Sequence, residues 1–453
     1  MRCLPEEFYH RMKKLLGAQF DAFCACYESE PQRALRVNLL KISIQKFKKC
    51  FPHALKETPF SKESFVVDDS FSNPGRHPLH HAGAFYMQEP SAASAVTALS
   101  PKPGEKVLDL CAAPGGKSTQ IASALEGQGL LWSNEIVPKR AKILLSNIER
   151  MGVKNAVVSA CRPDVLCAKL RGFFDKILVD APCSGEGMFR RDEQAVSDWS
   201  VEHVKACAAR QLSILRSAKE ALRPGGVLVY STCTFSMEEN EGVVAAFLKE
   251  NPEFMLEEIK AGFGRPGFAR IGGVNETDKT RRIFPMDGGE GHFVARLRKT
   301  GGEQTSPPLY RAGRLAPATA GLYERLWRDI FTTSMDTVPV LAGESLLLLP
   351  DGLPDCRGLT ILRAGLLLGV LRKNRVEPAH ALFMAARAGE LCQALNFSAE
   401  SEEIQRFLRG EEIPVPQGTK GYTGVAVEGV VTGFGKASNG VLKNHYPKGL
   451  RNL

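Results

Sequence analysis

Apolar runs and amphipathic stretches alternate through the middle of the chain. Four short apolar runs bounded by turns indicate buried strands: EKVLDL, GLLWSN, FFDKILVD and GGVLVY. Residues 138–152 are typical of a helix, with Pro138 in the first turn and Gly152 as the stop. The apolar face of that helix is formed by Ala141, Leu144, Leu145, Ile148 and Met151. Residues 76–300 are therefore predicted to form an α/β domain.

Smaller regions flank this domain. Residues 1–75 combine a helical start with the strand-like ALRVNLLKI, so we expect a small α+β domain there. The polar stretch 301–315, which contains Gly and Pro, is predicted to be a linker. Residues 316–378 predict a small α/β domain with one helix and short strands. Residues 379–453 predict a helical patch followed by strands such as GYTGVAVEGVVTGFGKA.

Composition limits the class of protein without choosing one. Lys plus Arg number 59 and Asp plus Glu number 50 among 453 residues, a net charge of +9 that suits either a polyanionic partner or an ordinary basic protein. Twelve cysteines without a paired framework predict free thiols in a reducing compartment. The chain start lacks the apolar core of a secretory signal, and no apolar run reaches the roughly 18 residues of a membrane span. We therefore expect a cytoplasmic protein without membrane contact.

The segment EKVLDLCAAPGGKSTQIASAL predicts a strand ending near Cys111, a glycine turn and a helix beginning around Gly116. Gly115 and Gly116 carry no side chain where a backbone must approach a ligand, and the helix start offers free N–H groups. The spacing differs from that of a phosphate-binding P-loop. Glu135, at the end of the next predicted strand, could accept both hydroxyls of a ribose. The ordered set predicts a nucleoside cofactor, and an ordinary tight turn is the alternative.

Two cysteines follow predicted buried strands: Cys183 in DAPCSGEGMFRR and Cys233 in YSTCTFSMEEN. Ligands bind beyond the carboxyl ends of the strands in an open α/β sheet, so both thiols are expected in one cleft with the cofactor motif. The alternative is that both are buried small hydrophobic residues, as many free cysteines are.

Chemistry on a pyrimidine would explain two thiols in one cleft. Its C5 is a poor nucleophile until a thiolate adds to C6, after which C5 can attack the methyl of a sulfonium donor. The C5 proton must then leave and the thiol must be expelled, which one nucleophilic cysteine and a second acid/base group would achieve. Asp180, at the end of its strand, is placed to hydrogen-bond the base edge, and capping a loop is its alternative role.

These motifs resemble those of the NOL1/NOP2/Sun family of RNA 5-methylcytosine methyltransferases. They are VLDLCAAPGGKS, NEIVPKRAKILLSNIERMG, FFDKILVDAPCSGEGMFRRD and VYSTCTFSMEENEGVV, with RVNLLK, HAGAFYMQEPSA, RRIFP and GHFVARL as outer motifs. The tail segments LRAGLLLGVLRKNRVEPAHAL and GFGKASNGVLKNHYPKGLR are similar to the bacterial subfamily that modifies small-subunit ribosomal RNA. The resemblance implies a Rossmann-like S-adenosylmethionine-dependent methyltransferase domain, a small N-terminal RNA-binding domain and mixed α/β, PUA-like C-terminal domains.

The resemblance also implies roles for individual residues. Cys233 of the Thr-Cys motif would attack C6, and Cys183 of the Pro-Cys motif would assist release. Asp180 would lie between cofactor and target base, and Lys117 would touch the catalytic centre. The residues expected to bind S-adenosylmethionine are Cys111, Ala112, Ala113, Pro114, Gly115, Gly116, Lys117, Glu135, Arg162 and Asp180.

Arg162 marks a departure from the family pattern. The family often has an acid at the end of the third strand to hold the adenine amine, whereas VVSACRPDVL places Arg162 near that point. Asp164, two residues on, is the alternative contact.

Three further features receive structural or RNA-binding interpretations. The three histidines of a predicted loop lack a suitably spaced cysteine or acid, so no metal site is expected: they are His77, His80 and His81. Ser236 followed by Glu239 predicts a capping box opening the helix after Cys233. His445 and Tyr446 in the basic tail are predicted to stack on RNA and bind its phosphates.

The expected function is methylation of cytidine C5 in 16S ribosomal RNA by a monomer that holds S-adenosylmethionine. The same chemistry on transfer RNA or on 23S ribosomal RNA is one alternative. A non-catalytic RNA-binding factor of ribosome assembly is the other, although such a factor would need neither cysteine.

Overall fold

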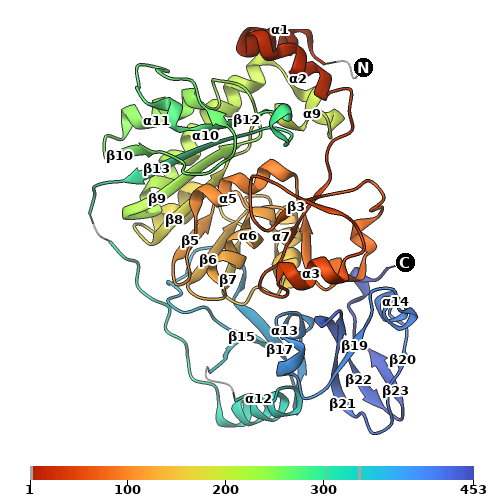
Figure 1. Ribbon diagram of the computed structural model, residues 1–453. Helices are drawn as coiled ribbons and strands as arrows, with labels where there is room; N and C mark the ends of the chain where they lie inside the picture. Colours follow the sequence, from red (N-terminus) through yellow and green to blue (C-terminus); the bar gives the residue numbers. More distant parts are fainter. Residues whose placement is uncertain (1–3, 304, 335–337, 453) are drawn as a thin grey trace.

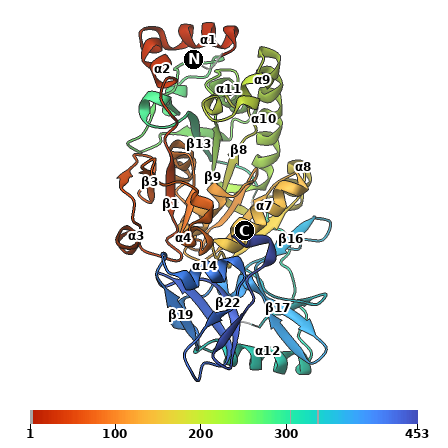
Figure 2. The same cartoon turned by 90° about the vertical axis from the view of Figure 1, so that its right-hand side faces the viewer.

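The computed structural model describes residues 4–303, 305–334 and 338–452, and the strands within them form four sheets (Figure 1). Helices α1 and α2 lie at one end of the molecule and the two C-terminal sheets lie at the other (Figure 2). The largest sheet lies between these ends. No helix of the described segments is long and apolar enough to cross a membrane.

The largest sheet has ten strands in the order β11-β12-β13-β9-β8-β5-β6-β7-β16, with β10 paired to β13. Its parallel strands are β5 (Lys106–Asp109), β6 (Leu130–Asn134), β7 (Ala156–Ser159), β8 (Phe174–Asp180) and β9 (Leu222–Thr232). The chain runs outward from β5 to β6 and β7, and then returns to β8 on the other side of β5. Ligands bind beyond the carboxyl ends of strands at such a reversal. The prediction of a Rossmann-like domain is confirmed.

Antiparallel strands extend this sheet at both edges. They are β10 (Phe254–Glu257), β11 (Arg265–Pro266), β12 (Arg281–Ile283), β13 (His292–Lys299) and β16 (Ile361–Ala364). Strand β13 pairs with β9, with Phe293 opposite Thr232, so the chain segment that starts at His292 passes beside the end of β9. Strand β16 comes from the C-terminal part of the chain and pairs with β7.

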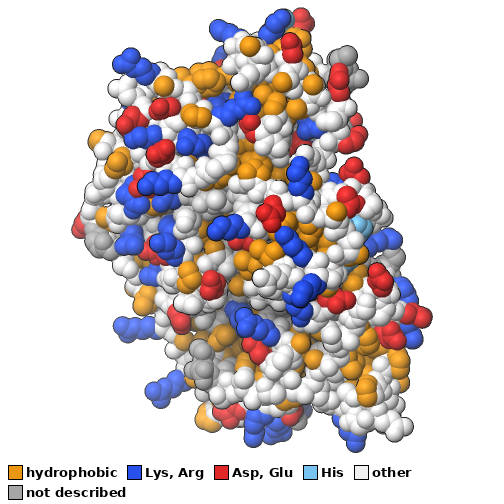
Figure 3. Space-filling model, in the orientation of Figure 1, with side chains coloured by type: hydrophobic (Ala, Val, Ile, Leu, Met, Phe, Trp, Pro, Cys, Tyr) orange, Lys and Arg blue, Asp and Glu red, His pale blue; other side chains and the backbone are white. Residues whose placement is uncertain are grey.

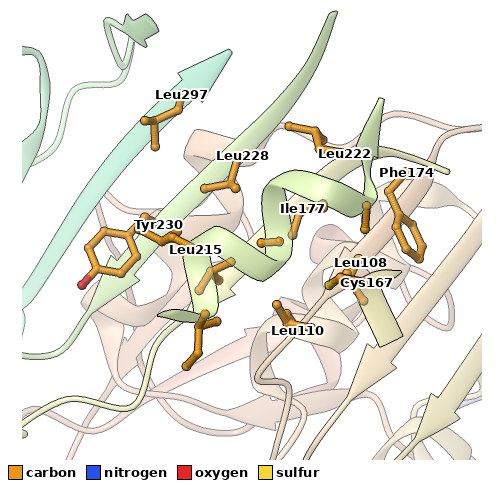
Figure 4. Packing of buried hydrophobic residues seen from close by; sticks show 14 of the residues in the cluster. Leu108, Leu110, Cys167, Phe174, Ile177, Leu215, Leu222, Leu228, Tyr230 and Leu297 are labelled. Carbon is orange, nitrogen blue, oxygen red and sulfur yellow. The ribbon is translucent and has the colours of Figure 1, made fainter. Parts of the chain in front are cut away.

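Helices cover both faces of the largest sheet and bury its apolar side chains. One face carries α5 (Ser94–Leu99), α6 (Gly116–Leu125) and α7 (Pro138–Arg150), and the other carries α8 (Pro163–Lys169), α10 (Val201–Ala221) and α11 (Glu241–Glu250). On the second face Leu215 of α10 packs in one cluster with Leu108, Ile177 and Leu228 from three strands (Figure 4). Helix α7 begins at Pro138 and buries the apolar face predicted from its spacing.

The N-terminal region forms a four-stranded sheet in the order β2-β3-β1-β4. Its strands are β1 (Ala34–Val37), β2 (Leu55–Glu57), β3 (Ser64–Val67) and β4 (Phe85–Met87), and its helices are α1 (Glu6–Leu16), α2 (Phe20–Cys26), α3 (Ile44–Cys50) and α4 (Pro78–His81). Strand β4 lies beyond the expected boundary at residue 75. Helices α1 and α2 pack through Phe8 and Phe23 against Phe189 and Phe235, which follow the two cysteines of interest.

The C-terminal part contains two sheets, β14-β15-β17-β18 and β19-β21-β22-β23-β20. The strands of the first are β14 (Val340–Ala342), β15 (Ser345–Leu348), β17 (Leu366–Arg372) and β18 (Arg375–Pro378). Those of the second are β19 (Ala394–Phe397), β20 (Ile413–Pro414), β21 (Gly421–Val427), β22 (Val430–Ser438) and β23 (Val441–Asn444). Helices α12 (Pro317–Ile330), α13 (His380–Met384) and α14 (Glu402–Arg409) accompany them. The exact domain limits stay a prediction.

The contact between the chain's tail and its N-terminal region corrects two predictions. Tyr446 is buried, and its hydroxyl lies 2.7 Å from Nδ1 of His81, so its ring is not free to stack on RNA. The predicted loop that holds His81 contains the short helix α4, capped by the His77 side chain. Lys41 joins the same regions, because its ammonium donates to the carbonyls of Ala82 at 2.7 Å and Val431 at 3.3 Å.

Candidate active site

The structure brings Cys183 and Cys233 together at the edge of the largest sheet. Strands β8 and β9 are parallel neighbours, with Asp180 opposite Ser231 in register, so the residues that follow them meet at one edge. The two sulfurs lie 3.3 Å apart. Two buried cysteines that merely filled core volume would not need to leave adjacent strand ends at this separation.

Hydrogen bonding and burial favour the protonated form of Cys183. Its contact with the Cys233 sulfur, together with burial, raises the pKa of the Cys183 thiol well above its usual value. Cys183 is therefore a neutral thiol at neutral pH and can donate a proton to its neighbour.

Asp180 and Lys117 form a partly buried ion pair next to the two thiols. The Lys117 ammonium lies 2.8 Å from Oδ2 of Asp180, and the Ser231 hydroxyl donates to Oδ1 at 2.8 Å. Burial by itself would raise the pKa of Asp180, but Lys117 and the hydrogen bond from Ser231 hold it below its usual value. Burial would lower the pKa of Lys117, and Asp180 outweighs that effect and raises it. Both groups are therefore charged at neutral pH.

The segment 111–117 forms the glycine loop between β5 and α6. Gly115 has φ +116°, which favours glycine, and α6 begins at Gly116 without a side-chain cap on its first N–H groups. The carbonyls of the loop accept hydrogen bonds from outside it: Arg140 donates to Ala113 at 3.0 Å and Asn147 to Pro114 at 2.9 Å. The loop is thus fixed through its carbonyls, which leaves the helix N–H groups available for a carboxylate.

Arg36 supports this loop from the N-terminal sheet. It is buried, and its guanidinium donates to the Gly116 carbonyl at 3.0 Å and to the Thr119 hydroxyl at 2.7 Å. A side chain at Gly116 would meet the Tyr86 ring at 3.2 Å, so the N-terminal region also sets the space around the loop. The sequence motif around Arg36 was noted, but its contact with the glycine loop was not predicted.

Two carboxylates end the strands beside the loop. Glu135 directly follows β6 and is buried; its Oε1 accepts from the Val137 amide at 2.9 Å, and Arg140 lies 3.4 Å from Oε2. Asp109 ends β5, accepts from the Ser118 hydroxyl at 2.7 Å and has a second oxygen without a partner among the residues that the structure describes. Burial raises the pKa of Asp109 to about 7. Sequence reasoning missed Asp109, although its place before the glycine loop was a usable signal.

The donors and acceptors of this region fit a nucleoside with an amino-acid tail. Free N–H groups at α6 suit a carboxylate, Glu135 suits ribose hydroxyls, and the unpartnered oxygen of Asp109 suits an ammonium or N–H donor. S-adenosylmethionine carries all of these groups.

Arg162 and Asp164 lie beyond β7 and pair with each other. Two hydrogen bonds join them, at 3.1 and 2.8 Å, and the side chain of Arg162 is 70% exposed. Contact of either residue with adenine stays a prediction.

The capping box predicted after Cys233 is wrong. Helix α11 begins at Glu241, and Ser236 donates instead to Glu186 at 2.7 Å. Glu239 accepts from the backbone N–H of Ser184 at 3.0 Å. Both side chains therefore bond to the loop that carries Cys183 instead of capping helix α11.

His292 is a second residue near the site that the sequence did not single out. It begins β13 next to the end of β9, is buried, and has its Nδ1 3.3 Å from the Ser91 hydroxyl. Burial and the nearby Lys117 lower the pKa of His292 to about 4, so the imidazole is neutral. In the described part of the chain, no group of three or more His, Cys, Asp or Glu side chains is arranged to hold a metal.

Four family profiles match successive parts of the chain. They are the N-terminal domain of 16S rRNA methyltransferase RsmF (residues 4–90), 16S rRNA methyltransferase RsmB/F (96–298), the first C-terminal domain of the RsmF rRNA methyltransferase (326–385) and the RsmF PUA domain (394–452).

Curated proteins and solved structures agree with these profiles. Ribosomal RNA small subunit methyltransferase F of Vibrio vulnificus (strain YJ016) is 32% identical over 99% of this chain and 97% of its own, and that of Klebsiella pneumoniae (strain 342) is 34% identical over 98% and 96%. A methyltransferase homolog protein from Pyrococcus horikoshii matches with a TM-score of 0.58 and 32% identity over 65% of this chain and 95% of its own. NSun6 from Pyrococcus horikoshii, solved with the S-adenosylmethionine analogue SFG, matches with a TM-score of 0.56 and 25% identity over 66% and 99%. The chain therefore belongs to the ribosomal RNA small subunit methyltransferase F family, whose enzymes depend on S-adenosylmethionine.

Proposed function

We propose that this protein methylates C5 of cytidine in 16S ribosomal RNA through a covalent bond between Cys233 and C6. The observation that carries the proposal is the pair of sulfurs 3.3 Å apart, next to the Asp180–Lys117 ion pair and the glycine loop. S-adenosylmethionine supplies an electrophilic methyl group on its sulfonium. The loop 111–117 and Glu135 would hold it.

The first half of the reaction would use Cys233 and Asp180. The Cys233 thiolate would add to C6, and the electron pair of the C5–C6 bond would form the bond from C5 to the methyl group. The bond between that methyl group and the sulfonium sulfur would break, its electron pair would stay on the sulfur, and S-adenosylhomocysteine would leave. Ionised Asp180 accepts hydrogen bonds from the N–H groups at the edge of the base and so holds the ring for attack. Lys117 keeps Asp180 ionised.

The second half would use Cys183. The bond between C6 and the Cys233 sulfur breaks as C5 loses its proton, which restores the double bond. The departing sulfur takes the proton of the neutral Cys183 thiol, and the resulting Cys183 thiolate accepts the C5 proton. Both cysteines end as thiols, and Cys233 must lose its proton before the next cycle.

The target cytidine would enter the site from single-stranded or flipped RNA, because a stacked base cannot reach two thiols at a strand edge. The N-terminal region and the PUA-like domain would grip the RNA on either side. Lys and Arg side chains are spread over the face in Figure 3 rather than gathered in one patch. That distribution supports contacts to a large folded RNA at several points. We also propose that the enzyme acts in the cytoplasm as a monomer.

Substrate choice is tested with labelled S-adenosylmethionine and four substrates, ribosomal subunits or free RNAs, whose RNA lacks the modification. Small subunits, large subunits, free ribosomal RNA and transfer RNA are incubated separately, and the products are digested to nucleosides. We expect 5-methylcytidine in small-subunit RNA alone. Label confined to another RNA would overturn the substrate, and absence of label with the cofactor bound would favour a non-catalytic assembly factor.

Glu135→Gln is expected to weaken binding of S-adenosylmethionine. A charged hydrogen bond contributes about 1.5–3 kcal/mol, so the dissociation constant should rise by about 10-fold to 100-fold. Isothermal titration calorimetry measures the change directly. Glu126→Gln, at the far end of α6, is the matched control and should bind as the wild type does. Equal affinity of both variants for S-adenosylmethionine would show that Glu135 does not bind the cofactor.

A further inference from the structure

We infer that Glu186 and Glu239 are positioning residues that hold the two cysteine loops against each other; this rests on the function proposed above. Each carboxylate belongs to the loop of one cysteine and accepts hydrogen bonds from the loop of the other. Residues 183–188 and 233–239 are here called the Cys183 loop and the Cys233 loop.

Glu186 holds the Cys233 loop in place from the Cys183 loop. Its carboxylate accepts from the Thr234 hydroxyl at 2.9 Å, the Phe235 amide at 2.9 Å and the Ser236 hydroxyl at 2.7 Å. A fourth bond comes from the indole of Trp199 at 2.9 Å. The three residues after the nucleophile are thus attached to one buried carboxylate.

Glu239 makes the reverse connection. It lies in the Cys233 loop and accepts from both the amide of Ser184, at 3.0 Å, and the Ser184 hydroxyl. Gln211 of α10 donates to the same carboxylate at 2.7 Å and to the Pro182 carbonyl at 3.1 Å. The residues on both sides of Cys183 are therefore held by Glu239 and its partner Gln211.

Direct contacts between the loops complete the arrangement. The Ser184 and Thr234 hydroxyls lie 2.8 Å apart, and the Gly187 amide donates to the Cys233 carbonyl at 2.9 Å. A side chain at Gly187 would meet that carbonyl at 3.0 Å, so the loops approach as closely as backbones allow.

The arrangement has a direct consequence for the thiols. Cysteine side chains are short, so the sulfur separation of 3.3 Å follows the loop backbones. Both carboxylates bond to loop atoms beyond the carboxyl ends of the sheet and to the neighbouring Trp199 and Gln211. Burying a carboxylate costs free energy unless hydrogen-bond donors surround it. Most of the donors that surround these two carboxylates come from the cysteine loops, which indicates that the carboxylates serve to fix the loops.

The test compares Glu186→Gln and Glu239→Gln with the control Glu238→Gln. Glu238 belongs to the same loop, but its side chain is 40% exposed and pairs with Arg11 at 2.7 Å. A glutamine keeps one acceptor oxygen and turns its amide toward the donors. Because a shift of about 1 Å in a reacting group can cost 10²-fold, we expect kcat to fall by about 100-fold in the two test variants. KM for RNA and for S-adenosylmethionine should stay within about twofold, since loss of a transition-state contact changes kcat alone.

Trapping experiments separate this inference from the proposed function. RNA containing 5-fluorocytidine cannot lose a C5 proton, so wild-type enzyme should accumulate the Cys233 adduct, and both test variants should form it about 100-fold more slowly. Test variants that turn over and form adduct like the control would overturn the inference alone. Wild-type enzyme without adduct or methyl transfer would overturn the proposed function.

Ser184→Ala provides a further test if a glutamate variant does not fold. It removes the hydroxyl bond to Glu239 without changing charge, and it should also lower kcat.

Discussion

Replacement of Cys233 by alanine is expected to abolish both methyl transfer and the covalent adduct with RNA. Alanine has no group that can add to C6, and C5 stays a poor nucleophile without that addition. Removal of a covalent nucleophile lowers turnover by about 10⁴-fold or more, so 5-methylcytidine should fall below detection. Digestion of the RNA product and denaturing electrophoresis of the protein–RNA mixture measure the two losses.

Cofactor binding should survive in Cys233→Ala. The glycine loop follows β5 and Glu135 follows β6, whereas Cys233 follows β9. Affinity for S-adenosylmethionine should therefore match that of the wild type, which shows that the site is intact. Cys392→Ala, at an exposed cysteine, is the control for thiol loss in general. Normal turnover by Cys233→Ala would refute its role as nucleophile.

Cys183→Ala is expected to accumulate the covalent adduct that Cys233→Ala lacks. The variant keeps the nucleophile and can complete the first half of the reaction. It lacks the neutral thiol that lies 3.3 Å from the departing sulfur, so release becomes slow. Loss of a general acid or base lowers turnover by about 10²-fold to 10⁴-fold. Electrophoresis should show a slowly migrating species that contains protein, RNA and the transferred methyl group.

Which of the two variants accumulates the adduct decides which cysteine is the nucleophile and which assists release. Adduct in Cys233→Ala and none in Cys183→Ala would exchange their roles. Release at the wild-type rate in Cys183→Ala would assign the proton transfers to another group, and the neutral imidazole of His292 is a nearby candidate.

Local patterns were sufficient for the elements that hold the cofactor. Strand β5, the glycine turn and α6 occupy adjacent residues, so apolar runs, Gly115 and the helix start predicted them directly. The same holds for α7, whose apolar face and Pro138 start need no distant partner. The meeting of the cysteines was also predictable, because parallel neighbours end at one edge of a sheet.

Contacts between distant segments were not predictable from these patterns. Ser236 and Glu239 have the spacing of a capping box, yet each bonds to the Cys183 loop about fifty residues earlier, since buried donors and acceptors there compete for them. Tyr446 was expected to stack on RNA and is instead buried against His81. Composition cannot distinguish an aromatic ring that binds RNA from one that joins two domains.

The sequence by itself determined the α/β domain, the position of the cofactor loop and the identity of the two cysteines. These depend on residues that are close in the chain or that share a strand edge. Only the tertiary structure decided which groups support them: Arg36 at the glycine loop, Lys117 against Asp180, and Glu186 and Glu239 between the cysteine loops. The physical reason is that a buried charge takes whichever partners the packed chain brings within hydrogen-bond distance, and those partners lie dozens of residues away.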